Sequence, residues 1–311
     1  EWETTVQKLV ENVSGKSGLN IGDVYYEVWN EPDLFGKFKA GGEKNYFDLY
    51  AHTIRGASNA EGINNYKIGG PATTGLYKNW FKGLLKMAQE SGLRVDFLSW
   101  HRYSKDLDKF EEDYLNAGRW LTEFPGFTGT ELIISEIGPN SENDPVYDNS
   151  FGAIHLLATS ALLEGNVGKT FIFEIKDGPG EKKYWGRWGI LTHEKFGTPE
   201  IKPRYQAISF LNRMDGEKVN VAGLGSWVKA FAKEKNGIVK TLVVNYDPSA
   251  KHNEAVPITF INLPTQSFTL KRINYEGGVS EINVATSSST WKTVQEFKPN
   301  TAAIFEIIPV K

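Results

Sequence analysis

The feature that most constrains this chain is a regular alternation of strand-like and helix-like segments over residues 1–214. Short apolar runs alternate with amphipathic stretches, and glycine closes several of the latter. This order predicts a parallel sheet with helices outside it. The expected strands are 23–31, 66–72, 94–103, 130–139 and 168–177, and the expected helices are 2–13, 43–62, 77–92, 107–124, 150–165 and 203–214.

The remaining residues, 218–311, have a different pattern. Strand-like runs such as "IVKTLVVNY" and "TAAIFEIIP" are separated by Asn, Gly, Pro and Ser, without a helical pattern between them. Such a segment predicts an antiparallel β-domain, a sandwich in particular. We therefore expect an α/β domain at 1–214 and a β-sandwich domain at 215–311.

Composition excludes several classes of function. The net charge of −3 gives no basic surface for nucleic acid, and no apolar run reaches the ~18 residues of a membrane span. Cysteine is absent, which excludes disulfides, thiol catalysis and Cys-ligated zinc but leaves the compartment undecided. The spacing of His52, His155, His193 and His252 is not that of metal ligands. We expect neither a metal nor a cofactor.

Two glutamates stand at the carboxyl ends of expected strands, where parallel α/β folds carry their function. The stretch "VYYEVWNEPD" ends with Glu31, and "ELIISEIGP" contains Glu136. A retaining glycosidase needs such a pair, one a protonated acid and one an ionised nucleophile, with carboxyl groups ~5–5.5 Å apart. The sequence between them has room for three βα units, as for strands n and n+3 of a closed barrel.

Further residues are candidates for binding a sugar. Asn30 could donate to a sugar 2-hydroxyl. His101 and Tyr103 alternate on one strand, so both can face the site and orient the nucleophile or bind a hydroxyl. Trp185 and Trp188 follow the last strand, where an indole either stacks on a sugar or simply packs.

Two other carboxylates have structural interpretations as well. Glu27 precedes Glu31 by four residues, and the favoured role of its carboxylate is an ion pair inside the barrel. Glu174 on the last strand is either a site carboxylate that binds substrate or a member of an internal pair.

Four segments, "YYEVWNEPDLF", "DFLSWHRY", "ELIISEIGP" and "WGILT…KPRYQAISFLNRM", resemble glycoside hydrolase family 39 of clan A. That family has a (β/α)8 TIM-type barrel with a small β-sandwich, and includes β-xylosidases, α-iduronidases and exopolysaccharide endoglycosidases. The resemblance implies that Glu31 is the acid/base and Glu136 the nucleophile. It also places His101 and Tyr103 after barrel strand 6.

The resemblance makes the five expected strands barrel strands 4 to 8, and the helix at 2–13 helix 3. Five strands cannot close a barrel. We therefore expect a separate or further amino-terminal segment to complete it by pairing with residues 24–30 and 168–175, since unpaired strand edges expose backbone hydrogen-bonding groups.

The sequence thus predicts a retaining glycoside hydrolase that acts on a carbohydrate, a β-xyloside or a polysaccharide. One alternative is a non-catalytic carbohydrate-binding protein on a degenerate barrel, although a binder does not need both carboxylates. Another is a glycosidase of a different clan A family, which the "WNEPD" and "SWHRY" contexts disfavour. The sugar, its anomeric configuration and exo or endo action stay open.

Overall fold

The computed structural model describes residues 1–263 and 266–310, which form two compact units. Each is described by itself. Unit 1 comprises Glu1–Tyr103, Asp108–Ile137 and Gly165–Ile172, and unit 2 comprises Ser104–Leu107, Gly138–Glu164 and the described residues of Phe173–Lys311.

Unit 1 is built on a five-stranded sheet of order β1-β2-β3-β4-β5. The pairs β1–β2, β2–β3 and β4–β5 are parallel, as the alternating pattern predicts. The strands are β1 (Val24–Glu27), β2 (Tyr66–Thr73), β3 (Phe97–Tyr103), β4 (Glu131–Gly138) and β5 (Lys169–Ile172), and the helices are α1 (Trp2–Val13), α2 (Tyr46–Ser58), α3 (Lys78–Ser91) and α4 (Asp108–Leu121).

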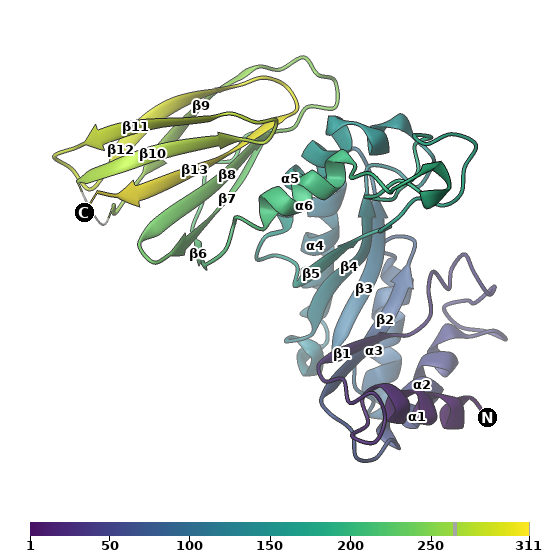
Figure 1. Cartoon of the computed structure of the whole chain (residues 1–311). Helices are drawn as coiled ribbons and strands as arrows, with labels where there is room; N and C mark the ends of the chain where they lie inside the picture. The colour runs from purple at the N-terminus through teal and green to yellow at the C-terminus, as the bar shows by residue number, and fades with distance from the viewer. Residues whose placement is uncertain (264–265, 311) are drawn as a thin grey trace. The chain divides into compact units, whose positions relative to one another are not determined.

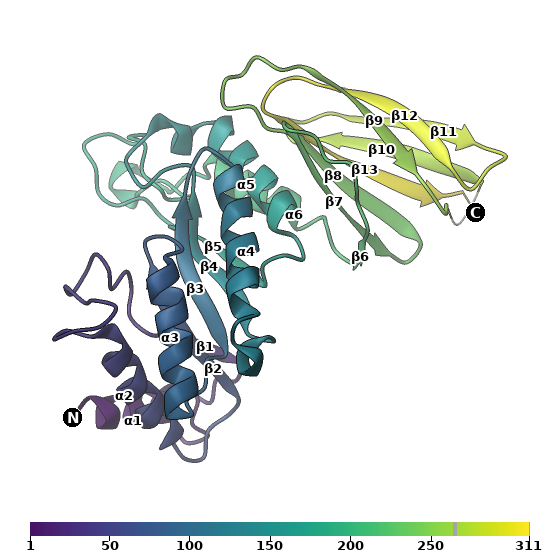
Figure 2. The same cartoon turned by 180° about the vertical axis from the view of Figure 1, so that it is seen from behind.

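Helices α3 and α4 lie on one face of this sheet (Figure 2). Their apolar sides are buried, because the side chains that recur every three or four residues point towards the strands. Phe81 of α3 packs edge-on against Trp120 of α4, with ring centroids 5.5 Å apart. Under them, Leu98 and Trp100 of β3 are fully buried. This layer fixes which face of β3 is turned away from the helices.

Unit 2 contains the antiparallel domain that the sequence predicts (Figure 1). A six-stranded sheet of order β11-β10-β13-β8-β7-β6 accompanies a two-stranded sheet of β12 and β9. Phe268, Phe297 and Phe305 form the centre of the core between them. The strands are β6 (Glu217–Val219), β7 (Val228–Lys235), β8 (Ile238–Asn245), β9 (Glu254–Phe260), β10 (Ser267–Asn274), β11 (Val279–Ala285), β12 (Trp291–Phe297) and β13 (Thr301–Pro309).

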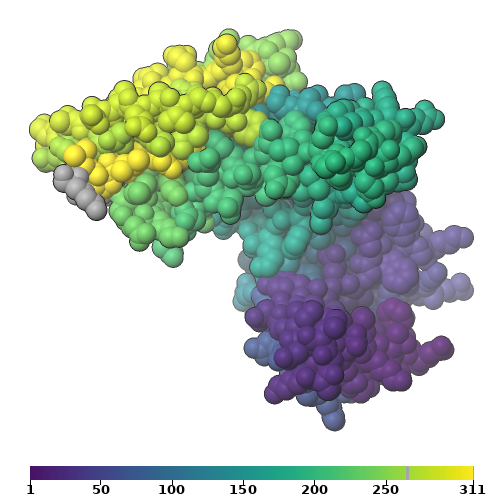
Figure 3. All heavy atoms as spheres, viewed as in Figure 1, coloured from purple at the N-terminus to yellow at the C-terminus, as the bar shows by residue number. Residues whose placement is uncertain are grey.

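Two helices also belong to unit 2: α5 (Ser150–Leu163) and α6 (Pro203–Leu211). Helix α5 packs against α6 and against β7, β8 and β13. In Figure 3 the atoms of the antiparallel strands, coloured green to yellow, pack together without a break. The domain boundary at 214/215 stays a prediction. None of the helices among the described residues combines the length and apolar character needed to cross a membrane.

Two expected strands are shorter than the sequence pattern suggested. The strand expected at 23–31 ends at Glu27 because Trp29 and Glu31 adopt left-handed φ angles of 71° and 46°, which break the pleat. The strand expected at 168–177 ends at Ile172. Beyond it, the backbone of Glu174 exchanges hydrogen bonds with residues 188–190 instead of continuing along β4. A full barrel is not shown by these five strands.

Candidate active site

Strand β3 sorts its side chains between the two faces of the sheet. Asp113 of α4 accepts hydrogen bonds from Trp100 Nε1 at 2.9 Å and from Arg102 Nε and Nη2 at 2.6 Å each. These contacts hold the helix-facing side of β3. Because successive side chains of a strand alternate, His101 and Tyr103 face the opposite side, as the sequence predicts.

Glu31 lies in the turn that follows β1. Its backbone N–H donates to the Ala72 carbonyl at the end of β2 at 2.9 Å, and its own carbonyl accepts from Leu34 and Phe35. The left-handed φ of Glu31 is a strained conformation for a residue with a Cβ. Neighbouring hydrogen bonds therefore hold the turn that carries this carboxylate.

Glu136 reaches the same face through an irregularity in β4. The pairing of β4 with β5 shifts register between Ile134 and Ile137. Strict alternation from the fully buried Ile134 would turn Glu136 towards the helices. The shift instead lets Glu136 accept a hydrogen bond from Tyr103 Oη at 2.7 Å.

The four side chains form one connected cluster. His101 Nδ1 lies 2.8 Å from Glu31 Oε1 and 3.4 Å from Glu136 Oε2, and one carboxylate oxygen of each glutamate lies within 4.8 Å of the other. The His101 side chain is 1% exposed, whereas those of Glu31 and Glu136 are 14% and 21% exposed. The two carboxylates are thus partly open to solvent on either side of a buried imidazole.

The surroundings of the two carboxylates differ. Burial raises the pKa of Glu31, and the negative charge of Asp33 raises it further. Burial also raises the pKa of Glu136, but His101 and the hydrogen bond from Tyr103 act to lower it. Burial lowers the pKa of His101, which favours a neutral imidazole. Glu136 thus has two neighbours that favour its ionised form, while the charges of Glu31 and Glu27 oppose it.

The cluster is also the group of described residues whose donor atoms are close enough together to surround a cation. Two carboxylates and an imidazole are suitable donors for several divalent metals. A pair of carboxylates in unequal surroundings is equally what acid–base chemistry uses. We assign no metal to it.

The remaining predicted residues fall into two groups. Asn30 precedes Glu31 with its side chain exposed. Glu174, Trp185 and Trp188 belong to unit 2, where Glu174 pairs with Arg187 at 3.2 Å. The guanidinium of Arg187 lies 3.9 Å from the Trp188 ring centroid and 5.6 Å from that of Trp185. Binding of substrate by these three residues stays a prediction.

Three further residues contribute to the site. Glu27 has a different role from the one expected, and Asp33 and Thr74 were not predicted from the sequence. Glu27 forms no salt bridge with a described residue, and its charge instead raises the pKa of His101 and of Glu136. Asp33 and Thr74 hydrogen-bond to each other beside Glu31. Asp33 belongs to the "WNEPD" stretch, but nothing in the sequence pointed to its partner.

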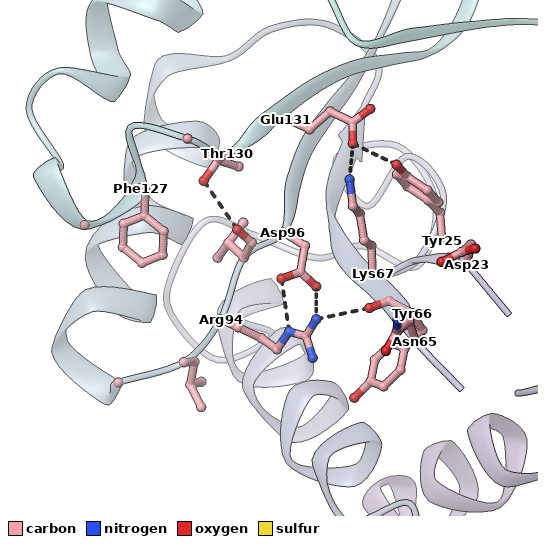
Figure 4. A pocket seen from close by; sticks show the side chains of 15 residues that line it. Asp23, Tyr25, Asn65, Tyr66, Lys67, Arg94, Asp96, Phe127, Thr130 and Glu131 are labelled. Atoms are coloured by element: carbon pink, nitrogen blue, oxygen red, sulfur yellow. Dashed lines mark hydrogen bonds and ion pairs between the residues drawn. The ribbon is translucent and has the colours of Figure 1, made fainter. Parts of the chain in front are cut away.

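A hollow of about 1080 Å³ lies at the other ends of the strands (Figure 4). Glu131, at the start of β4, accepts from Lys67 Nζ at 2.7 Å and from Tyr25 Oη at 2.8 Å. Beside them, Arg94 pairs with Asp96 at 2.6 Å. In barrel folds this end of the strands serves stability rather than chemistry, and the ion pairs here have that character.

Comparison with known proteins identifies the family. The family model described as "Glycosyl hydrolases family 39" matches residues 1–267. A β-xylosidase of Caldicellulosiruptor saccharolyticus is 26% identical over 253 residues, which are 71% of this chain and 48% of that protein. Human α-L-iduronidase is 27% identical over 157 residues, 45% of this chain and 23% of that protein. The chain spans about half the length of the β-xylosidases it matches.

Solved structures show the same fold. A monomeric β-xylosidase from Caulobacter crescentus CB15 superposes with a TM-score of 0.75 at 19% identity, covering 100% of this chain and 75% of that one. The family 39 enzyme from Xanthomonas axonopodis pv. citri gives a TM-score of 0.75 at 18% identity, covering 99% and 73%.

Proposed function

The chain belongs to glycosyl hydrolase family 39, and we propose that it forms the catalytic part of a retaining glycoside hydrolase. The separation of the two carboxylates carries this proposal. One oxygen of Glu31 and one of Glu136 lie within 4.8 Å. Retaining enzymes hold their carboxyl groups ~5–5.5 Å apart, whereas inverting enzymes leave ~6.5–9.5 Å for a water molecule.

Glu136 is the proposed nucleophile. It must be ionised to attack the anomeric carbon, and Tyr103 donates to its Oε2 at 2.7 Å. A donor to the carboxylate favours the charged form and fixes its orientation. The neighbouring His101 adds a second polar contact at 3.4 Å.

Glu31 is the proposed acid/base. In the first step it gives its proton to the glycosidic oxygen as Glu136 forms the covalent glycosyl-enzyme, and the aglycone leaves with that proton. In the second step Glu31 takes a proton from water, which attacks the same carbon and releases Glu136. Two inversions leave the anomeric configuration unchanged. The raised pKa of Glu31 suits the first step, because an acid must be protonated near the working pH.

The proposed substrate class is the β-xylosides. Two β-xylosidases are among the relatives with significant similarity, and a further β-xylosidase shares the fold. Asn30, next to Glu31, is the proposed donor to the sugar 2-hydroxyl. In unit 2, the side chains of Glu174, Trp185 and Trp188 are proposed to contact sugar.

Azide rescue tests both roles in the full-length protein with an aryl β-xyloside. Glu136→Gly should lose turnover by ~10⁴-fold or more and be rescued by azide to give the α-xylosyl azide, because azide replaces the nucleophile from the opposite face. Glu31→Ala should be rescued to the β-xylosyl azide. Glu90→Gln, an exposed carboxylate on α3, is the matched control. Rescue products of the opposite configurations would exchange the two roles, and full activity of Glu136→Gly would refute the proposal.

We propose in addition that a polypeptide segment pairs with the two outer strands of the sheet, along residues 24–30 and 168–172. The sequence pattern extended the second stretch to 175, but the backbone of Glu174 and Ile175 bonds to residues 188–191 instead. The edge positions of β1 and β5 support this pairing, as does the exposed Phe171, which is 51% accessible. Hydrogen exchange on the full-length protein tests it. Backbone amides of both edges should be protected as strongly as those of β3, and rapid exchange at either edge would contradict the pairing.

A further inference from the structure

The turn that carries Glu31 is strained and needs external support. Trp29 and Glu31 have φ angles of 71° and 46°, and such left-handed conformations are unfavourable for residues with a Cβ. They persist only where the surroundings determine them. The backbone bond from Glu31 to Ala72 supplies one contact between this turn and the end of β2.

Asp33 supplies a second connection between the same two segments. Its Oδ1 accepts from the Thr74 backbone N–H at 3.0 Å, and its Oδ2 accepts from Thr74 Oγ1 at 2.5 Å. Thr74 Oγ1 also lies 2.9 Å from Tyr77 Oη, just before α3 begins. Hydrogen bonds to a carboxylate are stronger than neutral ones, so both oxygens of Asp33 are fixed to the loop between β2 and α3.

The position of the Asp33 carboxylate affects the pKa of Glu31. Three groups face Glu31: His101 on β3, Glu136 on β4 and Asp33 in the same turn. Glu27 and Tyr103 affect the titration of Glu136. The charge of Asp33 opposes ionisation of Glu31, in addition to that of Glu136, whose carboxylate oxygen lies within 4.8 Å. Only Pro32 separates Asp33 from Glu31 in sequence, so the turn that orients Glu31 also determines where the charge of Asp33 lies.

We propose that Asp33 is a positioning residue for the acid/base: anchored by Thr74, it holds the strained turn that presents Glu31 and places a negative charge beside it. The catalytic part of this inference rests on the proposed function. The electrostatic part does not, because the protonation of Glu31 is measurable without turnover.

The decisive variant is Asp33→Asn, which removes the charge but keeps an oxygen for the Thr74 N–H. Asp23→Asn removes the same charge at an exposed position just before β1 and is the matched control. In the full-length protein with ¹³C-labelled glutamate carboxyls, the Glu31 signal is identified by its loss in Glu31→Gln. Glu31 should titrate at lower pH in Asp33→Asn and unchanged in Asp23→Asn.

Kinetics separate the charge from the anchor. With an alkyl xyloside, whose leaving group needs a proton, the basic limb of kcat/KM should move to lower pH in Asp33→Asn. Thr74→Val keeps the charge but loses one anchor, so kcat should fall on the order of tenfold without movement of the limb, and Thr74→Ser should restore it. A dinitrophenyl xyloside, which leaves unprotonated, should show a smaller loss in the first step.

An unchanged Glu31 titration in a folded Asp33→Asn protein would overturn the proposal. Asp33→Ser provides the same comparison if the first variant does not fold. If the wild-type protein hydrolyses no glycoside, the proposed function fails, and the titration still decides whether Asp33 acts on Glu31.

Discussion

The contact between α4 and β3 makes a quantitative prediction about how the site is supported. Asp113 is 5% exposed and receives three hydrogen bonds, one from Trp100 and two from Arg102. The residues that alternate with these two, His101 and Tyr103, contact the carboxylates. Replacement of Asp113 by alanine should therefore affect both the stability of unit 1 and catalysis.

The magnitude follows from what is left without a partner. Trp100 is fully buried, and a buried donor without an acceptor costs about 1–3 kcal/mol. Breaking a buried ion pair costs about 3–5 kcal/mol, but the Arg102 side chain is 23% exposed and regains some water. Burial raises the pKa of Asp113 although Arg102 lowers it, so the pair itself is not a large net gain. We expect a loss of about 3 kcal/mol from Asp113→Ala.

Thermal unfolding followed by circular dichroism measures this loss. At about 2–4 °C per kcal/mol, Tm should fall by about 6–12 °C, and kcat/KM should fall even well below Tm. Asp113→Asn keeps an acceptor for Trp100 and should lose about half as much. Glu112→Ala removes the adjacent, exposed carboxylate, whose partner is Lys109 at 2.9 Å, and should change Tm little. Equal shifts in Asp113→Ala and Glu112→Ala would refute the reasoning.

Three further outcomes are expected. Tyr103→Phe removes a donor that lowers the pKa of Glu136, so the acidic limb of kcat/KM should move to higher pH; an unmoved limb would contradict it. Burial lowers the pKa of His155 to about 4. The neutral imidazole contributes fully to stability above the pKa of histidine in the unfolded chain, about 6.5. As the pH falls from there towards 4, the free energy of unfolding should decrease by about 3 kcal/mol. Urea unfolding at pH 7 and pH 4.5 should show this loss, and His155→Leu should reduce it, whereas replacement of the exposed His52 should not. Chelation by EDTA should leave kcat unchanged, since both proposed steps use carboxylates; loss restored by one added metal would disprove this.

Much of the cluster could be predicted from the sequence, because parallel strands deliver their carboxyl ends to one edge of a sheet. Alternation on β3 placed His101 and Tyr103 on one face. The alternation rule fails at Glu136, which reaches that face only through the register shift in β4. A shift of this kind depends on how β4 pairs with β5, and the sequence of β4 alone contains no sign of it.

Other features depend on contacts between segments far apart in the chain. The strand pattern of "VYYEVWNE" continues past Glu27, but the backbone turns because Glu31 is bonded to the end of β2. The connection between Asp33 and Thr74 joins residues 41 positions apart. Local sequence propensity predicts neither the end of β1 nor the Asp33–Thr74 connection, because contacts between distant segments determine the conformation of this turn.

The unequal surroundings of the two carboxylates lead to a last prediction. Tyr103 favours the charged form of Glu136, and Asp33 opposes the charged form of Glu31. Each influence widens the pH interval in which one carboxylate is ionised while the other is protonated. The double variant Tyr103→Phe/Asp33→Asn should therefore narrow the bell-shaped profile of kcat/KM from both sides. Because the glutamates lie within 4.8 Å, their titrations are coupled, and the narrowing should differ from the sum of the single shifts. A profile as wide as that of the wild type would show that these neighbours do not separate the two titrations.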